Sequence, residues 1–247
     1  MSTTKIRWLA LAIVGGISVS CTTRNLKPSA SEIDLFKSVG MKASAYDAVI
    51  ESVEPRPIWR EKNLSIEIDL DTSHPCSVKV ADEAVKFTKS LENLFGFTFI
   101  ITRHDAYANN FVLFRIFSGE TFASANKDQD QLIVESGADP TEVIGRGSAE
   151  NARLRNMQIT LRTPEAHERG VCPTEEFSNV LLFFSGPFFL SPLSDERVKI
   201  TSDQRRTIRL LLWSMAYNDR GYNPKADRAT QRRLFLEYIR VLEASSR

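Results

Sequence analysis

The sequence lacks the residue patterns that common metal, nucleotide and hydrolase sites require. It has only three histidines, His74, His104 and His167, and they stand too far apart for a short metal-ligand spacing. The Gly-Arg-Gly at 145–147 lacks the further glycine and the lysine of a phosphate-binding loop, so we interpret it as a turn. There is no Gly-x-Ser-x-Gly nucleophile elbow. The sequence therefore predicts no metal site and no cofactor.

A strong excess of charge is also lacking. The chain has 32 Lys and Arg and 31 Asp and Glu, and removal of residues 1–20 would take away only Lys5 and Arg7. The remaining 227 residues are then almost neutral, which argues against a general nucleic-acid-binding protein. The apolar run at 8–17 has about ten residues, well short of the roughly 20 that a membrane-spanning helix needs.

That apolar run belongs to a three-part N-terminal pattern. Lys5 and Arg7 precede it, and the small residues 18–20 separate it from Cys21. This order is typical of a bacterial lipoprotein signal peptide, which is cut before a cysteine that carries diacylglycerol. We therefore predict a signal peptide at 1–20, lipidation at Cys21 and a periplasm-facing position in the cell envelope, since several acyl chains anchor a protein stably.

A plain secretory signal cut near Ser20 is the alternative, because Ser18 stands where lipoprotein signals usually carry an aliphatic residue. If Cys21 is lipidated, Thr22 after it favours the outer membrane, since it is not the aspartate of inner-membrane retention.

The rest of the chain predicts a tether with short helices at 21–55 and one globular domain at 56–247. Residues 22–31 are polar, 32–53 have helical periodicity, and Pro55 and Pro57 then interrupt the chain. Later elements are expected as strands at 64–70, 97–102, 111–117 and 157–162, and as helices at 80–95, 175–184, after 201 and at 228–242. We expect Gly96, Thr174 and Thr201 or Ser202 to cap helices.

The segment 119–156 is polar and contains several glycines, so we interpret it as a long excursion with a short helix after Ala149. Strands in the first half and helices in the C-terminal third predict a single α+β domain with a small β-sheet.

Two cysteines remain after Cys21. In an oxidising compartment Cys76 and Cys172 have only each other as an intramolecular partner, which predicts a disulfide. Two buried free thiols are the alternative.

The segment 172–179 is the one local cluster whose residues could take part in catalysis or binding. It contains Cys172, Glu175 and Glu176 in the pattern Cys-x-x-Glu-Glu, with Asn179 three residues later. With Ile58-Trp59-Arg60, the helix end at 94–96 and the strand start at 109–112, it resembles an uncharacterised domain family of proteobacterial putative lipoproteins, over residues 56–220. The resemblance implies an envelope location and an α+β fold, but no reaction. Asn179 departs from the family's Gln, and 183–187 departs from its glycine-rich segment.

Glu175 and Glu176 have two interpretations. Carboxylates in a first helical turn interact favourably with the helix dipole, by about 0.3–1 kcal/mol. Alternatively, one of them is a general base. A zinc-peptidase helix has a similar topology, but the two metal-binding histidines are absent here.

Residues 201–247 hold ten Lys and Arg against five Asp and Glu. This excess either orients the protein against anionic lipid or phosphate-bearing polymers, or belongs to solvated helix faces. We predict a lipid-anchored envelope protein that binds a partner or assists an assembly. Its predicted partners are the membrane, an envelope protein or an anionic envelope polymer, not nucleic acid. A hydrolase with Glu175 or Glu176 as general base is the alternative function.

Overall fold

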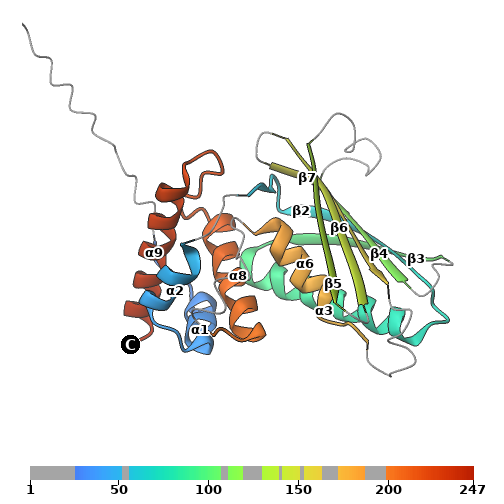
Figure 1. Ribbon diagram of the computed structural model, residues 1–247, viewed down its shortest axis with the longest axis horizontal. Helices are drawn as coiled ribbons and strands as arrows, with labels where there is room; N and C mark the ends of the chain where they lie inside the picture. The colour runs from blue at the N-terminus through green and yellow to red at the C-terminus, as the bar shows by residue number, and fades with distance from the viewer. Residues whose placement is uncertain are drawn as a thin grey trace, which may run out of the picture.

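A mixed β-sheet and a group of helices lie side by side in the computed structural model (Figure 1). The structure describes residues 26–51, 56–106, 111–118, 130–138, 141–150, 153–162, 172–186 and 199–247. The helices are α1 (Ala30–Val39), α2 (Ala43–Ile50), α3 (Pro75–Phe95), α6 (Glu176–Ser185), α8 (Ser202–Tyr217) and α9 (Arg228–Ser245). The strands are β1 (Ile58–Trp59), β2 (Asn63–Leu70), β3 (Thr98–Asp105), β4 (Phe111–Phe117), β5 (Asp130–Ala138), β6 (Thr141–Glu150) and β7 (Arg153–Arg162).

The sheet is built around a β-α-β unit. β2 and β3 pair in parallel, and α3 connects them. Among the described residues the strand order is β3-β2-β4-β7-β6-β5, with β1 paired to β7 in parallel. β4 is antiparallel to β2, and β7, β6 and β5 continue antiparallel. A parallel pair needs a long crossover, which α3 supplies.

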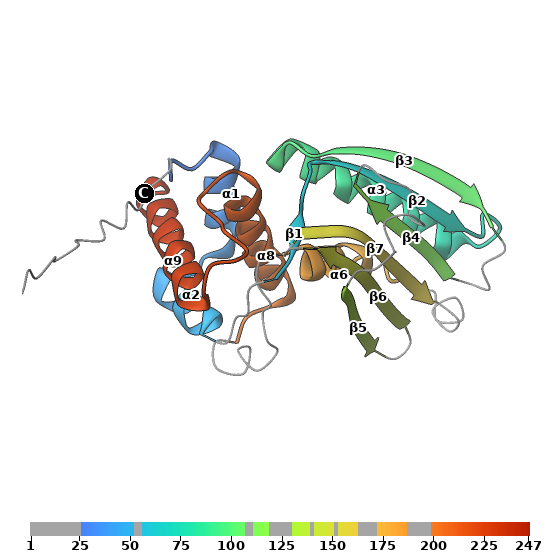
Figure 2. The same cartoon turned by 90° about the horizontal axis from the view of Figure 1, so that it is seen from above.

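One face of this sheet is covered by α3 and α6 (Figures 1 and 2). In β2 the apolar residues alternate with polar ones, and Leu64, Ile66 and Ile68 are buried. α3 begins with His74 as N-cap and Pro75 in its first turn, and ends at Gly96, whose φ of 67° lies in the left-handed region that favours glycine. The alternation and the caps together place the apolar face of α3 on the sheet.

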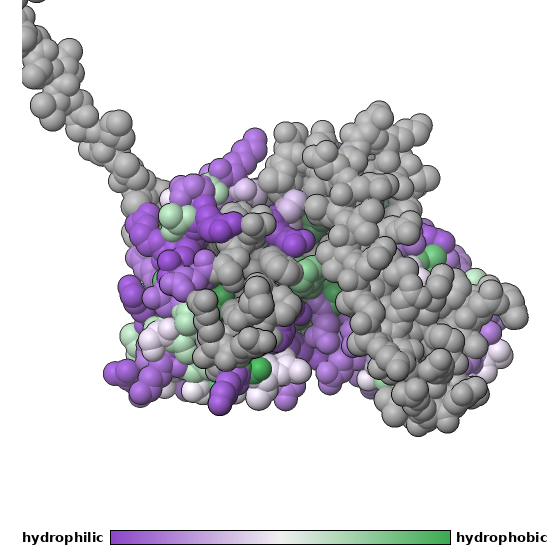
Figure 3. All heavy atoms as spheres, in the orientation of Figure 1, coloured by the Kyte–Doolittle hydropathy of each residue, from purple (hydrophilic) through white to green (hydrophobic). Residues whose placement is uncertain are grey.

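A second core lies in the helical group, which contains α1, α2, α8 and α9. α8 contributes to both cores, because Leu210, Trp213 and Tyr217 pack toward the sheet whereas Leu211 and Met215 pack toward the other helices. α8 begins at a capping box between Thr201 and Gln204. Figure 3 shows hydrophilic side chains over the outer side of this helical group, away from the sheet.

These observations confirm a single α+β domain, with helices dominating the C-terminal part. The one or two short helices expected at 32–53 are two, α1 and α2, and both add side chains to the core that α8 and α9 share. The division at residue 55 stays a prediction. In the part of the chain that the structure describes, no helix is both long and apolar enough to span a membrane.

The prediction for 119–156 was wrong in its described parts. β5 and β6 occupy 130–138 and 141–150, and no helix follows Ala149, because 149–150 are in β6 and β7 begins at 153. The Gly-Arg-Gly at 145–147 is likewise strand rather than turn. β6 pairs from residue 142 to residue 150 with β7, the next strand in the sequence, so hydrogen bonding within the sheet outweighs the weak strand preference of a polar, glycine-containing segment.

Candidate functional site

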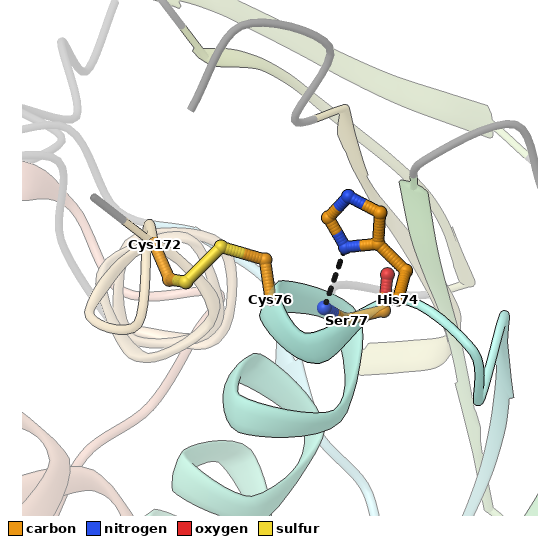
Figure 4. The surroundings of a disulfide bond; sticks show 4 residues. All are labelled: His74, Cys76, Ser77 and Cys172. Carbon is orange, nitrogen blue, oxygen red and sulfur yellow. Dashed lines mark hydrogen bonds between the residues drawn. A yellow bond between two sulfur atoms is a disulfide. The ribbon is translucent and has the colours of Figure 1, made fainter. Parts of the chain in front are cut away.

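The start of α6 is tied covalently to the start of α3. Cys76 in the first turn of α3 is joined by a disulfide to Cys172, with their Cα atoms 5.3 Å apart (Figure 4). The pairing predicted from the sequence is therefore present in the structure. The Cα separation is within the usual range for disulfides. The bond places the residues that follow Cys172 beside α3.

α6 begins one residue later than predicted. Its N-cap is Glu175, which makes no side-chain capping hydrogen bond, so the prediction that Thr174 caps this helix was wrong. Thr174 instead lies in a turn in which its N–H donates to the carbonyl of Cys172 at 2.9 Å. The disulfide and this turn determine the backbone here, which outweighs the capping preference of threonine. Glu176 is the acidic residue of the first helical turn.

A pocket of about 300 Å³ lies where α3, the start of α6 and α8 meet. Its lining consists of Glu83, Lys86, Phe87, Ser90, Thr174, Glu175, Phe177, Ser178 and Arg206. Three elements far apart in the sequence therefore contribute to it. Of the two glutamates singled out from the sequence, Glu175 is exposed and lines the pocket, whereas Glu176 is half-buried outside that lining.

The pocket carries charges of both signs around aromatic rings. The guanidinium of Arg206 lies over the ring of Phe87, 4.9 Å from its centroid. Lys86 pairs with Glu83 at 2.6 Å, and this hydrogen bond raises the pKa of the Lys86 ammonium. Phe87 and Phe177 are both buried. The arrangement suits a ligand that has an acidic group, a hydrogen-bond donor and some apolar surface.

Behind the pocket, α6 and α8 bury further charge. Burial, and then the charge of Glu175, raises the pKa of Glu176. Burial, and then the neighbouring Arg205, lowers the pKa of Arg209 to about 10. Arg209 donates to the carbonyl of Asn179 at 3.4 Å and lies over the ring of Phe183. Glu176 thus has the shifted pKa that acid–base chemistry uses, while Glu175 has the position in the pocket.

The remaining candidates from the sequence lie apart from this pocket. His74 caps α3 through its contact with the N–H of Ser77, and His104 is in β3. Cys21 and His167 lie outside the described residues. No cluster of three or more His, Cys, Asp or Glu that could hold a metal ion occurs among the residues that the structure describes.

Sequence reasoning missed Arg206 and the pair of Glu83 and Lys86 as pocket residues. The signal available was weak: Glu83 and Lys86 have the spacing of neighbours on a helix, and Arg206 was counted only in the C-terminal basic excess. Nothing local indicates that these two helices meet.

A second polar cluster is buried in the helical group. The fully buried Glu32 of α1 accepts a hydrogen bond from Arg220 at 2.9 Å and from the hydroxyl of Tyr238 at 2.7 Å. Ser214 and Asn218 also donate to its carboxylate. Arg220 lies in the turn between α8 and α9, and is 9% exposed. An ion pair that is this deeply buried needs such extra hydrogen bonds to offset its desolvation.

These contacts decide the ionisation of Glu32. Burial acts to raise the pKa of Glu32, but hydrogen bonds from Ser29 and Tyr238 and the charge of Arg220 outweigh it, and the pKa lies below its usual value. Burial, and then the negative charge of Glu32, raises the pKa of Tyr238. The carboxylate is therefore charged and the phenol neutral at neutral pH.

Comparison of the chain with known proteins finds no relationship: no family model, no curated protein and no solved structure matches it. The resemblance to the lipoprotein family therefore stays a prediction.

Proposed function

We propose that this chain is a cell-envelope protein that is anchored by lipid at Cys21 and that binds a charged segment of an envelope partner in the pocket between α3, α6 and α8. The N-terminal pattern and the family resemblance support the anchor. The disulfide between Cys76 and Cys172 is consistent with an oxidising location outside the cytoplasm.

The observation that carries the binding function is the lining of the pocket. Arg206 and Lys86 offer donors to a carboxylate, Glu175 offers an acceptor, and Phe87 and Phe177 offer apolar surface. A polypeptide segment with both kinds of charge meets these groups better than a uniformly anionic polymer does. We therefore favour an envelope protein as the partner.

A photo-crosslinking amino acid at Ser90, in the full lipidated protein in cells, tests this proposal. We expect one partner of defined mass to be captured from Ser90 and not from Thr72, an exposed position outside the pocket. The variant Arg206→Glu should abolish that capture while the protein stays folded. The same products from Ser90 and Thr72, or capture that Arg206→Glu does not change, would contradict binding in the pocket.

One observation favours the hydrolase as a second candidate. Burial, and then the charge of Glu175, raises the pKa of Glu176, and a raised pKa is a property shared with carboxylates that act as general acids or bases. Against it, Glu176 is not part of the pocket lining. The binding function therefore comes first, and the Glu176→Gln variant discussed below separates the two.

A further inference from the structure

The first described residues are held firmly at the helical end of the molecule. Leu26 packs against the core that α1, α2, α8 and α9 form. The carbonyl of Lys27 accepts a hydrogen bond from Arg220 at 2.5 Å, and the same arginine pairs with Glu32. The chain is thus bound to the turn between α8 and α9 within a few residues of Cys21.

This attachment limits how far the helical end can be from a lipid on Cys21. Leu26 is the fifth residue after Cys21, and an extended chain spans at most about 3.6 Å per residue. Leu26, and the part of the helical core that it packs against, therefore stays within about 18 Å of a lipidated Cys21, less than the length of α9, which is about 27 Å at 1.5 Å per residue.

α9 presents a row of arginines at that end. Arg233 and Arg240 are exposed and seven residues apart, about two helical turns, so they share one side of the helix axis; Arg247, also exposed, lies just beyond the end of the helix. The exposed residues of α9 include the arginines 228, 233 and 240, whereas the acidic residues Glu237 and Glu243 of the same helix are partially exposed and offset part of this charge. Arg247 is also within 3.5 Å of Glu243, yet its side chain is 80% exposed.

The position of α9 suits contact with a surface. It forms the outer layer of the helical group, on the side away from the sheet, in both views of the ribbon (Figures 1 and 2). Lys27 and Lys225 add exposed positive charge near the same end, while Asp219 and Asp227 at the turn before α9 oppose it. The balance is positive, and a basic surface within reach of the headgroups is attracted to anionic lipid.

We infer that the α9 face with Arg233, Arg240 and Arg247 docks on an anionic phospholipid surface, so that the sheet and the pocket point away from the membrane. The inference rests on the proposed lipid anchor, which sets the distance, and on charge complementarity. Each basic residue near an anionic membrane contributes about fivefold to partitioning, so the three together contribute about 100-fold. Salt should weaken this attraction, since it screens charges over about 8 Å at physiological ionic strength.

Vesicle sedimentation with the mature chain carrying Cys21→Ser tests the surface without any lipid on the protein. We expect it to bind vesicles that contain phosphatidylglycerol and not vesicles of phosphatidylcholine alone. The triple variant R233Q/R240Q/R247Q should lower the partition coefficient about 100-fold. The control K79Q/K89Q/R103Q makes the same charge change at exposed positions around α3 and β3, and should have little effect.

Equal losses in the two triple variants would mean a general attraction of charge and would overturn the proposed surface, as would equal binding to both kinds of vesicle. Mass spectrometry of the N-terminus of the membrane-extracted protein is the separate test of the anchor. An unmodified chain beginning at Thr22 or later would refute lipidation. The vesicle experiment uses protein without lipid, so its result would still test the docking surface independently.

Discussion

The two ends of this molecule are held together by different forces. The sheet end combines an apolar core with a disulfide between Cys76 and Cys172. The helical end has its own apolar core, but it also buries the ion pair of Glu32 and Arg220, which are 188 residues apart in the sequence. α8 contributes side chains to both cores, so the two ends are packed against the same helix and form one domain.

Because the two ends are stabilised by different interactions, their stabilities should depend on different solution conditions. A disulfide stabilises mainly by restricting the unfolded chain and is largely indifferent to pH, but a reducing environment removes it. A buried ion pair depends on both partners being charged, and loss of either leaves the other charge buried without compensation. The sheet end should therefore respond to redox conditions, and the helical end to acid and to single substitutions.

The largest effect should come from Arg220→Met. The change leaves the carboxylate of Glu32 buried without its cation, which should lower the free energy of unfolding by about 3–5 kcal/mol. Urea unfolding followed by circular dichroism measures it. Arg232→Met, which removes the partially exposed pair with Asp47, is the control and should cost about 0–1 kcal/mol. Similar losses in both variants would show that the buried pair is no more important than a surface pair.

Removal of the disulfide should be next in size. Cys76→Ala with Cys172→Ala should lower the free energy of unfolding by about 2–5 kcal/mol, because the bond closes a long loop in the unfolded chain. Urea unfolding of the double variant measures the loss, and wild-type protein kept in reductant should show a loss of similar size. Unchanged stability in both would rule out a stabilising role for the bond.

Acid should weaken the helical end through Glu32. The pKa of Glu32 is lower in the folded protein than its usual value of 4.5, so its contribution to stability is complete above pH 4.5 and is lost as the pH falls through the folded pKa. Urea unfolding between pH 7 and pH 3 should show this loss in the wild type. The Glu32→Gln variant should be less stable than the wild type at pH 7, and its free energy of unfolding should change less as the pH falls. If the free energy of unfolding of the variant depends on pH as that of the wild type does, the prediction is contradicted.

The smallest effect should come from Glu176→Gln at the sheet end, which should change the free energy of unfolding in the opposite direction, toward greater stability. Because the pKa of Glu176 is raised, the wild type should gain stability as the pH falls through the folded pKa toward 4.5. Glutamine should therefore raise the free energy of unfolding at pH 7 by no more than about 1 kcal/mol, since it also gives up the helix-dipole attraction of about 0.3–1 kcal/mol. Thermal and urea unfolding at several pH values measure this.

Glu175→Gln is the matched control, because Glu175 is the exposed neighbour of Glu176 and should change the pH dependence less. Glu176→Gln alone should retain the cellular function if Glu176 acts through the helix terminus, because it lies outside the lining of the proposed binding pocket. A folded Glu176→Gln protein that behaves like a complete deletion would instead place the hydrolase ahead of the binding module.

Much of the fold follows from patterns within single segments. The alternation in 64–70, the helix that ends before Gly96 and a helix cap at Thr201 or Ser202, which is Thr201, were all predicted, and each depends on residues close in sequence. The cysteine pairing was predicted by elimination, since Cys76 and Cys172 had no other partner once Cys21 was assigned to the lipid.

The failures have other causes. β5 and β6 lack a strong apolar pattern of their own and gain their structure from strand pairing, β5 with β6 and β6 with β7. At Thr174, a disulfide and a turn outweighed a good capping residue. Of the pocket, the sequence indicated Glu175 but not Arg206 or Lys86, because those side chains come together only when α3 and α8 are in place.

The sequence by itself determined the type of most of the periodic elements, the end of α3 before Gly96, which cysteines pair, and which glutamates stand at the start of α6, because periodicity, capping and elimination depend on residues that a single sequence shows. Only the tertiary structure decided that Glu32 lies against Arg220, that Glu175 rather than Glu176 lines a pocket, and that α9 is the outer layer of the helical end. Those outcomes depend on which apolar faces pack together, and burial then determines which charges must find partners far away in the sequence.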